Sequence, residues 1–402
     1  MKKIFTILLT VLALAVAFAD VRLYSGGILF IQGDAAAGYP RAAEVIAILV
    51  ILFSAIRFRI NSIKVQFYLY ILFLFAFASF KPYYMGYFRT ACLIPTLLFT
   101  GILNFRVNKE ELVRFFTIIF CIISFSSSFV IISPFIDLGV EVYNVDIFDS
   151  DAQRFIGFGQ SLPYQAAFSL MSIPLFFYLI DTSKGIKRTL LFALVAFNAL
   201  AVVMTGARTA FGILFVLVLY YNREWRRLIS PKYFVVLAIV AIVISVYFGH
   251  ILFASITGRS DAGLSERDTV WIIAILLILT HPILGIQSFD KEGRQFGDVV
   301  AHSQNGFFEL MFWGGLLSFI LYWVTIYKCY ILNKIDKQNK RCFMGVLIIY
   351  MIFSVTEILF FSVQAYYLIV IVLGLLTANA LEIQQEKRII TNTSFNHEDN
   401  NS

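Results

Sequence analysis

Long apolar runs separated by short polar segments dominate this chain. Because the hydrocarbon core of a bilayer needs about 20 mainly apolar residues per crossing helix, these runs predict an all-α polytopic membrane protein with about 12 transmembrane helices. The predicted spans are residues 4–19, 42–56, 65–80, 88–105, 113–134, 163–181, 189–206, 209–222, 233–250, 306–328, 343–361 and 363–380. A further apolar run, Thr269 to Thr280, is too short to cross. We interpret it as an interfacial or re-entrant helix.

The polar connections between the spans differ in charge, and this difference orients the chain. Loops that carry Lys and Arg favour the cytoplasmic side of a membrane, whereas Asp and Glu have much less influence on orientation. If both termini are cytoplasmic, most of the 32 Lys and Arg residues lie in the connections on the cytoplasmic side. The sequence therefore predicts a membrane domain over residues 1–384, with external loops at 135–162 and 251–305, followed by a disordered cytoplasmic tail at 385–402. The basic start, apolar run and Ala17-Phe18-Ala19 also fit a cleavable signal peptide, and cleavage would leave the later orientation unchanged.

Composition narrows the function classes. Hydrophobic residues make up 60% of the chain, charged residues 14%, and the mean hydropathy is +0.82, which excludes an ordinary soluble domain. The net charge of +7 reflects cytoplasmic loops, so we expect no nucleic-acid partner. The four cysteines have no metal-binding spacing, and no nucleotide-binding fingerprint occurs. We therefore expect no metal, no cofactor and no ATP-driven transport.

A polar island from Ser255 to Asn305 interrupts the apolar pattern on the predicted outer side. Basic residues are disfavoured there, so those retained suggest a negatively charged partner. Guanidinium groups bind phosphate in a bidentate manner. The candidate phosphate-binding residues on the outer side are Arg154, Arg208, Arg259, Arg267 and Arg294.

Arg208 is the most informative of these arginines. It occupies a short turn between two apolar runs, where an arginine near hydrocarbon costs on the order of 2.5–3.5 kcal/mol even on lenient scales. Either it binds an anionic substrate or its side chain extends to lipid headgroups. The sequence alone supports both interpretations equally.

His302 is the candidate general base, since it lies just before the apolar run that begins near residue 306. A histidine side chain, with an ordinary pKa of about 6.5, can take a proton from a hydroxyl group near neutral pH. A helix-entry histidine bonded to its neighbours is the alternative, and His281 before Pro282 fits a structural role. Asp149 and Asp151 could bind Mg²⁺, but a solvated acidic loop explains them better.

Glu357 lies within an apolar run. It could partner an arginine or line a substrate cavity, and the sequence leaves both roles open.

Several segments together resemble the O-antigen polymerase and O-antigen ligase superfamily. The turn Thr205–Ala210 is similar to the family's Gly-Ser-Arg turn, with Ala207 in place of the usual Ser. Arg267 and Trp271, followed by His281–Gly285, resemble the family's Arg, Trp and His-Pro-Leu-Gly run. The resemblance covers roughly residues 150 to 330, and it depends on the order and spacing of the segments together.

Three further segments extend the resemblance. His302–Leu310 and Trp313–Leu317 are similar to the family's His-Asn, Leu and Gly-Leu-Leu-Gly elements, and Arg154–Gly159 resembles an Arg-Phe-Gly segment. In this chain Ser303 and Gln304 are inserted between the His and the Asn of the usual pair. Asn305 is the asparagine that follows His302 in this chain.

The resemblance implies a glycosyltransferase that polymerises undecaprenyl-diphosphate-linked oligosaccharides at the outer face of the plasma membrane. In this interpretation Arg208 and Arg267 bind the donor diphosphate and His302 deprotonates the acceptor hydroxyl. Substrate-binding residues would be Arg154, Arg259, Asn305 and Arg294.

The partners implied are the lipid-linked glycan donor and acceptor, the bilayer and a chain-length regulator. The first alternative is an O-antigen ligase that transfers glycan to lipid A core. The second is a glycolipid flippase or transporter, which would concentrate its functional charges near the bilayer midplane and show repeat symmetry.

Overall fold

The computed structural model describes residues 2–19, 39–58, 60–78, 89–132, 135, 142–144, 153–155, 162–228, 267–285, 295–296, 299–300, 305–357, 359 and 362–398. Its helices are α1 (Lys2–Ala17), α2 (Tyr39–Ala55), α3 (Ser62–Ala78), the π-helix η2 (Arg89–Leu93), α5 (Ile94–Ile102), α6 (Lys109–Ile132), α7 (Leu162–Leu170), α8 (Ser172–Leu179), the 3₁₀-helix η3 (Ile180–Thr182), α9 (Ile186–Met204), α10 (Arg208–Leu228), α12 (Arg267–Thr280), α13 (Gly306–Asn333), α14 (Lys337–Thr356) and α15 (Val363–Glu398).

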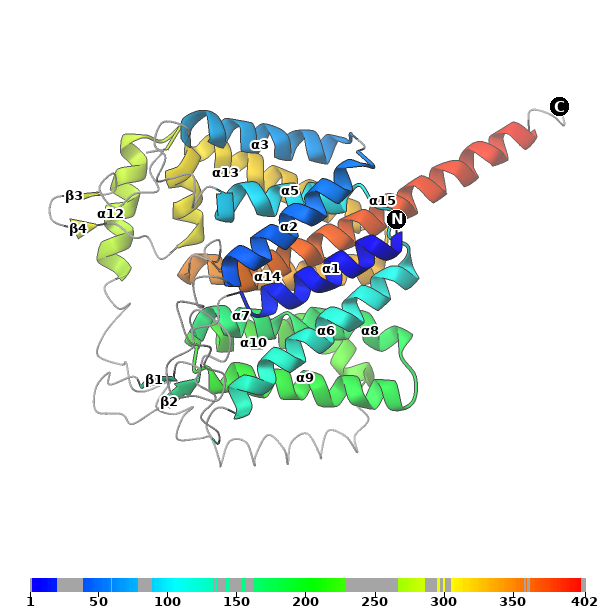
Figure 1. Cartoon of the computed structure of the whole chain (residues 1–402), viewed down its shortest axis with the longest axis horizontal. Helices are drawn as coiled ribbons and strands as arrows, with labels where there is room; N and C mark the ends of the chain where they lie inside the picture. Colours follow the sequence, from blue (N-terminus) through cyan, green and yellow to red (C-terminus); the bar gives the residue numbers. More distant parts are fainter. Residues whose placement is uncertain are drawn as a thin grey trace.

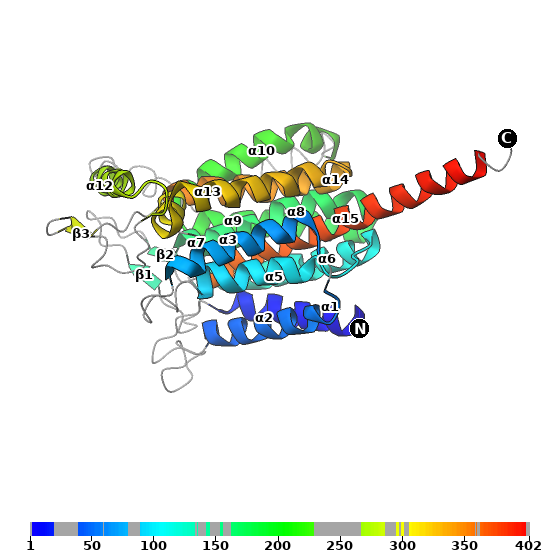
Figure 2. The same cartoon turned by 90° about the horizontal axis from the view of Figure 1, so that it is seen from above.

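Most of these helices run along one common axis and form a bundle. Figures 1 and 2 show the N-terminus and the C-terminal part of α15 at one end of the bundle, which we call the terminal end. Helix α12 and two short antiparallel ribbons lie at the opposite end, which we call the loop end. The ribbons pair β1 (Val142–Asn144) with β2 (Gln153–Phe155), and β3 (Gln295–Phe296) with β4 (Val299–Val300).

The predicted spans agree with this arrangement. Each predicted span except 233–250, which lies outside the described residues, coincides with one helix or with consecutive helices. Within the described part of the chain, six helices are long and apolar enough to cross a membrane, and shorter apolar helices accompany them. The helical, multi-span architecture is therefore confirmed, and the total of about 12 crossings stays a prediction. The short run at residues 269–280 is also helical, as part of α12.

Apolar side chains cover both the inside and the outside of the bundle. Helix α15 is central, since 83% of its most apolar window is buried, whereas α9 is peripheral with 28% buried. The peripheral helices expose large apolar side chains along their length, for example Ile48, Leu52, Leu69, Phe215 and Leu219. Water would disfavour such a surface, and lipid would cover it.

Two helices differ from the sequence expectation. Helix α15 continues to Glu398, through the segment expected to be a disordered tail, because its Glu, Gln and Lys residues are good helix formers. Figure 1 shows this part projecting beyond the bundle. Helix α13 is bent at Gly314 and Gly315, whose backbone angles are not helical. The predicted span 306–328 is therefore two helical pieces rather than one, and residues 316–333 are long enough to cross by themselves.

The bend in α13 is held by the turn that follows α12, and we call this contact the glycine joint. The backbone N–H of Leu316 donates to the carbonyl of Pro282 at 2.8 Å, and that of Leu317 donates to Ile283 at 3.4 Å. The bend frees these two N–H groups from bonding within α13, and the turn supplies their acceptors.

Two glycines with positive φ face each other in the glycine joint. Gly285 has φ +69° and Gly315 has φ +65°. A Cβ on Gly315 would stand 2.2 Å from the carbonyl oxygen of Ile283, and a Cβ on Gly285 would stand 2.5 Å from the carbonyl oxygen of Phe312. The resemblance segments His281–Gly285 and Trp313–Leu317 are thus the two halves of one backbone contact.

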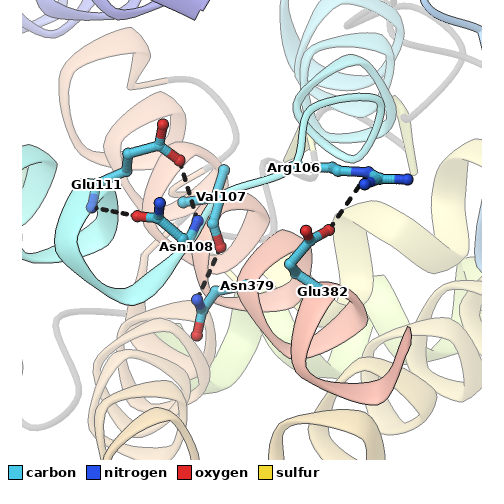
Figure 3. Close-up of polar contacts among 6 residues, drawn as sticks. All are labelled: Arg106, Val107, Asn108, Glu111, Asn379 and Glu382. Carbon is cyan, nitrogen blue, oxygen red and sulfur yellow. Dashed lines mark hydrogen bonds and ion pairs between the residues drawn. The ribbon is translucent and has the colours of Figure 1, made fainter. Parts of the chain in front are cut away.

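At the terminal end, polar side chains tie α15 to the loop between α5 and α6 (Figure 3). The amide of Asn379 donates to the carbonyl of Val107 at 2.8 Å. Its side-chain oxygen accepts from the amide of Asn339 at 2.9 Å. The next helix begins with a reciprocal cap, in which Asn108 and Glu111 each accept the other's backbone N–H at 2.8 and 3.0 Å. These contacts hold α15 against the start of α6 at this face.

We predict that Gly315→Ala destabilises the protein by about 2 kcal/mol or more, because the added Cβ meets backbone atoms and a positive φ is itself costly for alanine. The unfolding temperature of the purified protein in detergent measures this loss. The control is Gly212→Ala in α10, where a Cβ meets nothing within 4 Å and the helix-forming propensity favours alanine. Equal unfolding temperatures for the two variants would contradict the role of the glycine joint.

We also predict that Asn379→Ala lowers the free energy of unfolding by about 1–3 kcal/mol, because it leaves buried polar groups of α5–α6 and α14 without their partner. The matched control is Arg106→Gln. It removes an ion pair with Glu382 at 3.7 Å, in which the arginine side chain is 54% exposed. Such exposed pairs contribute about 0–1 kcal/mol. A larger loss of stability in the arginine variant would show that our assignment of the main contact is wrong.

Candidate active site

The predicted arginine Arg208 is the first residue of α10, after a tight turn. Gly206 makes the turn possible with φ +61°, and the Thr205 hydroxyl accepts the N–H of Ala207 at 3.4 Å. The N–H of Ala210 bonds to the Ala207 carbonyl at 3.0 Å, so the helix begins directly. The first N–H groups of a helix have no acceptor within it, and the positive end of the helix dipole lies there. This turn is therefore suited to an anion.

The start of α10 lies beside the end of α14. The two helices pack together, and the later part of α10 meets the start of α14, where the Tyr221 hydroxyl donates to the carbonyl of Arg341 at 2.9 Å, as expected for an antiparallel pair. Arg208 precedes Tyr221 by as many residues as Ser354 follows Arg341. Because both helices rise by the same distance per residue, the backbone of Arg208 is level with the last turn of α14. The side chain of Arg208 lies outside the described residues.

Asn305 connects the same turn of α14 to the start of α13. Its side-chain oxygen accepts the backbone N–H groups of Phe307 at 2.9 Å and Phe308 at 3.1 Å, which makes it the N-cap of α13. Its amide nitrogen donates to the carbonyl of Val355 at 2.9 Å. Both ends of the buried amide are thus used in holding α13 against α14. The predicted substrate contact of Asn305 is not tested by these bonds.

Arg267 begins α12, and an aromatic contact brings this helix to α13. The rings of Trp271 and Phe308 meet edge to face, with centroids 6.3 Å apart. Trp271 is one turn after Arg267, and Phe308 is one turn after Asn305. Together with the glycine joint at the other end of α12, this contact sets the helix alongside the first piece of α13. The side chain of Arg267 lies outside the described residues.

The remaining predicted residues are placed in part. Arg154 belongs to β2, where its backbone is opposite Tyr143, and its side chain is not described. His302, Arg259, Arg294, Asp149 and Asp151 lie outside the described residues. In the chain, His302 is two residues after the end of β4 and three before Asn305. The structure therefore brings the starts of α10, α12 and α13 to the loop end, and the side chains expected to act there remain predictions.

His281 is exposed, and its Nδ1 lies 2.9 Å from the hydroxyl of Thr280. It also accepts the N–H of Gly285 through its backbone carbonyl at 2.9 Å. These contacts agree with the structural role expected for this histidine at the entry to the glycine joint.

Two buried acidic residues at the loop end, Glu309 and Glu44, were not among the site residues predicted from the sequence. Glu309 is fully buried on the first turns of α13, and Glu44 on α2 is nearly so. Glu357 caps α14, with its N–H bonded to the Phe353 carbonyl at 2.7 Å, and is partly buried. A lone carboxylate within an apolar run is the signal that could have identified Glu309, because an ionisable group is costly in such surroundings.

Behind this end, amide and hydroxyl side chains join the central helices. The Gln364 amide donates to the side-chain oxygen of Gln165 at 3.1 Å and to the Ala17 carbonyl at 3.0 Å. The hydroxyls of Ser127 and Ser169 lie 3.0 Å apart. Such bonds between helices hold polar residues that lipid would not solvate. They connect α1, α6, α7 and α15 beneath the starts of α10, α12 and α13.

Comparison with protein families matches residues 191–323 to the family described as O-antigen ligase. No curated protein compared with the chain matches it. The matched segment covers about a third of the chain and includes the start of α10, all of α12, Asn305 and the glycine joint. The superfamily resemblance found in the sequence is confirmed over this segment. Residues 191–323 are therefore similar to the O-antigen ligase family, which supports the resemblance to the O-antigen polymerase and ligase superfamily.

Proposed function

We propose that this protein is a membrane glycosyltransferase that polymerises undecaprenyl-diphosphate-linked oligosaccharides into O-antigen or another surface polysaccharide. The observation that carries the proposal is the meeting of three helix starts at one end of a membrane bundle. Each bears a residue or segment suited to the reaction: Arg208 on α10, Arg267 on α12, and the segment from His302 to Asn305 before α13.

The diphosphate of the donor fits the start of α10 better than the start of α13. Asn305 already accepts the first N–H groups of α13, whereas helix geometry leaves those of Arg208 and Thr209 to an outside acceptor. A phosphate oxygen would take these N–H groups and the guanidinium of Arg208 together. Arg267 would neutralise the second phosphate. Arg154, Arg259 and Arg294, with Asn305, stay proposed substrate contacts.

In the proposed reaction, His302 takes the proton of an acceptor sugar hydroxyl, and the hydroxyl oxygen attacks the anomeric carbon of the donor. The bond between that carbon and the diphosphate oxygen breaks, and its electrons stay on the diphosphate, which leaves with the lipid. Arg208 and Arg267 stabilise the charge that develops there. A single displacement inverts the configuration at the anomeric carbon. No metal ion is needed in this scheme.

The location proposed for this chemistry follows from the charge pattern. With about 12 crossings, both termini in the cytoplasm of a bacterium and the loop end outward, the active site faces the outer side of the plasma membrane. The positions of the N-terminus and of α15 at one end of the bundle (Figure 2) support this topology. A chain-length regulator in the same membrane is a proposed further partner.

An O-antigen ligase that transfers the finished glycan to lipid A core is the second candidate. The description of the matched family favours it, and the same three helix starts would serve either acceptor. A deletion strain separates the two functions. Loss of a polymerase leaves lipid capped with a single repeat unit, whereas loss of a ligase leaves no O-antigen on the surface lipid.

We predict that His302→Ala lowers glycan transfer by about 10²–10⁴-fold, the contribution typical of a general base. Arg208→Ala should cause a comparable loss, because one stabilising group at the leaving oxygen contributes about 10²–10³-fold. Transfer is measured with purified protein and a lipid-linked oligosaccharide, and the product chains are resolved by gel electrophoresis. Membrane insertion and unfolding temperature are recorded for each variant.

His281→Ala is the matched control for the histidine, because His281 is exposed and contacts Thr280. Arg188→Ala, at the terminal end before the apolar part of α9, is the control for the arginine. Both controls should retain transfer. Full polymer production by correctly inserted His302→Ala or Arg208→Ala protein would remove the residue from the mechanism.

A further inference from the structure

Helix α12 has an outward face that is entirely apolar. Every residue from Val270 to Leu279 is apolar, and the side chains directed away from the bundle include Ile272, Ile275, Leu276 and Leu279, of which Ile272 is 61% and Leu279 65% exposed. The opposite face packs on the bundle through Ala274, which is fully buried. This spacing of outward residues makes one stripe along the helix. Exposing this stripe to water would cost free energy.

The apolar stripe of α12 is followed by the exposed residues Thr280 and His281, and the apolar surface resumes in the turn and joins the lipid-facing surface of α13. Beyond the helix, Ile283 is 65% exposed, and its carbonyl accepts the N–H of Leu317. From that residue, the exposed apolar side chains of α13 follow its outer face through Ile320 and Val324. The two surfaces therefore meet at the glycine joint without a polar residue between Ile283 and Leu317.

The glycine joint also fixes the height of α12 relative to the membrane. Backbone hydrogen bonds from Leu316 and Leu317 to the turn, with no room for a side chain on Gly285 or Gly315, couple α12 to the spanning piece of α13. Figure 1 shows α12 directed across the bundle axis, and Figure 2 shows it end on. A helix in this orientation lies along a membrane surface rather than through it.

We propose that the outward face of α12 is seated in the leaflet at the loop end of the bundle, covered by lipid acyl chains. The junction with the lipid-facing surface of α13, where the exposed Ile283 lies beside Leu317, selects this occupant over a protein partner. An interfacial helix buries its apolar face at the boundary between headgroups and acyl chains. Its first residue, Arg267, is then held at the depth of lipid phosphates. Resting on the proposed function, this means that the lipid-linked donor reaches Arg267 sideways from the leaflet.

Depth can be measured with nitroxide labels on single cysteines. Of the four cysteines, Cys92, Cys329 and Cys342 are buried and Cys121 is exposed, so Cys121→Ala gives a background with little reactivity. Leu276→Cys and Leu279→Cys report on the stripe. Val324→Cys on the lipid-facing surface of α13 is the deep reference, and Ile186→Cys, 88% exposed at the terminal end, is the aqueous reference.

The labelled proteins are placed in nanodiscs of phosphatidylethanolamine and phosphatidylglycerol, and collisions with oxygen and with a water-soluble nickel complex are compared. We expect positions 276 and 279 to give oxygen-to-nickel ratios well above position 186 and below position 324. Ratios equal to position 186 would place the stripe in water and overturn the proposal. Protection from both reagents would indicate cover by protein, such as a second copy, and would overturn it as well.

A functional measurement separates this inference from the proposed activity. Leu279→Asn should reduce transfer of lipid-linked glycan and raise nickel accessibility at position 276, whereas Ile186→Asn should change neither. The depth measurement needs no substrate. Membrane-seated labels in a protein without glycosyl transfer would therefore remove the proposed function alone, and aqueous labels in an active enzyme would remove this inference alone.

Discussion

The arrangement of the loop end depends on the backbone contact between the turn after α12 and the bend of α13. A helix that bends at two glycines exposes N–H groups that a membrane environment cannot satisfy. The carbonyls of Pro282 and Ile283 satisfy them, and two residues with positive φ allow the backbones to approach. Because the contact is made by main-chain atoms, changes of side-chain rotamer do not alter it. It converts the spanning piece of α13 into a support for α12, and so for the positions of Arg267 and Asn305.

The starts of α13 and α10 differ in whether their first N–H groups already have an acceptor. At α13, Asn305 accepts the free N–H groups and also bonds to α14, so this start is fixed and already occupied. At α10, a turn through Gly206 leads directly into the helix, and the first N–H groups face outward from it. One start thus fixes Asn305 against α14, and the other is suited to receive charge. The same principle of capping supports two different tasks.

The sequence predicted the features that follow from averages over many residues. Apolar length predicted the helices, and the asymmetry of Lys and Arg predicted termini at one end. The resemblance segments identified His281–Gly285 and Trp313–Leu317, but not that they bind each other, because a contact between distant backbone atoms leaves no local pattern. The bend in α13 was missed for a related reason, since two glycines in an apolar run also fit a straight helix. Asn305 was expected to contact substrate, and its capping role depends on the position of α14, which no local spacing reveals.

The polar groups of the bundle differ between its two ends in what they bond to. At the terminal end, Asn379 and Asn339 bond to each other, and Asn379 also bonds to the Val107 carbonyl, so the groups are consumed in holding helices together. In the middle, bonds such as that between Gln364 and Gln165 serve the same purpose. At the loop end, α10 and α12 begin at the predicted arginines Arg208 and Arg267, so the positive end of each helix dipole lies at one of them. In our proposal the start of α10, which follows the turn through Gly206, is where the charge of an anionic substrate is stabilised, because the positive end of the helix dipole lies there.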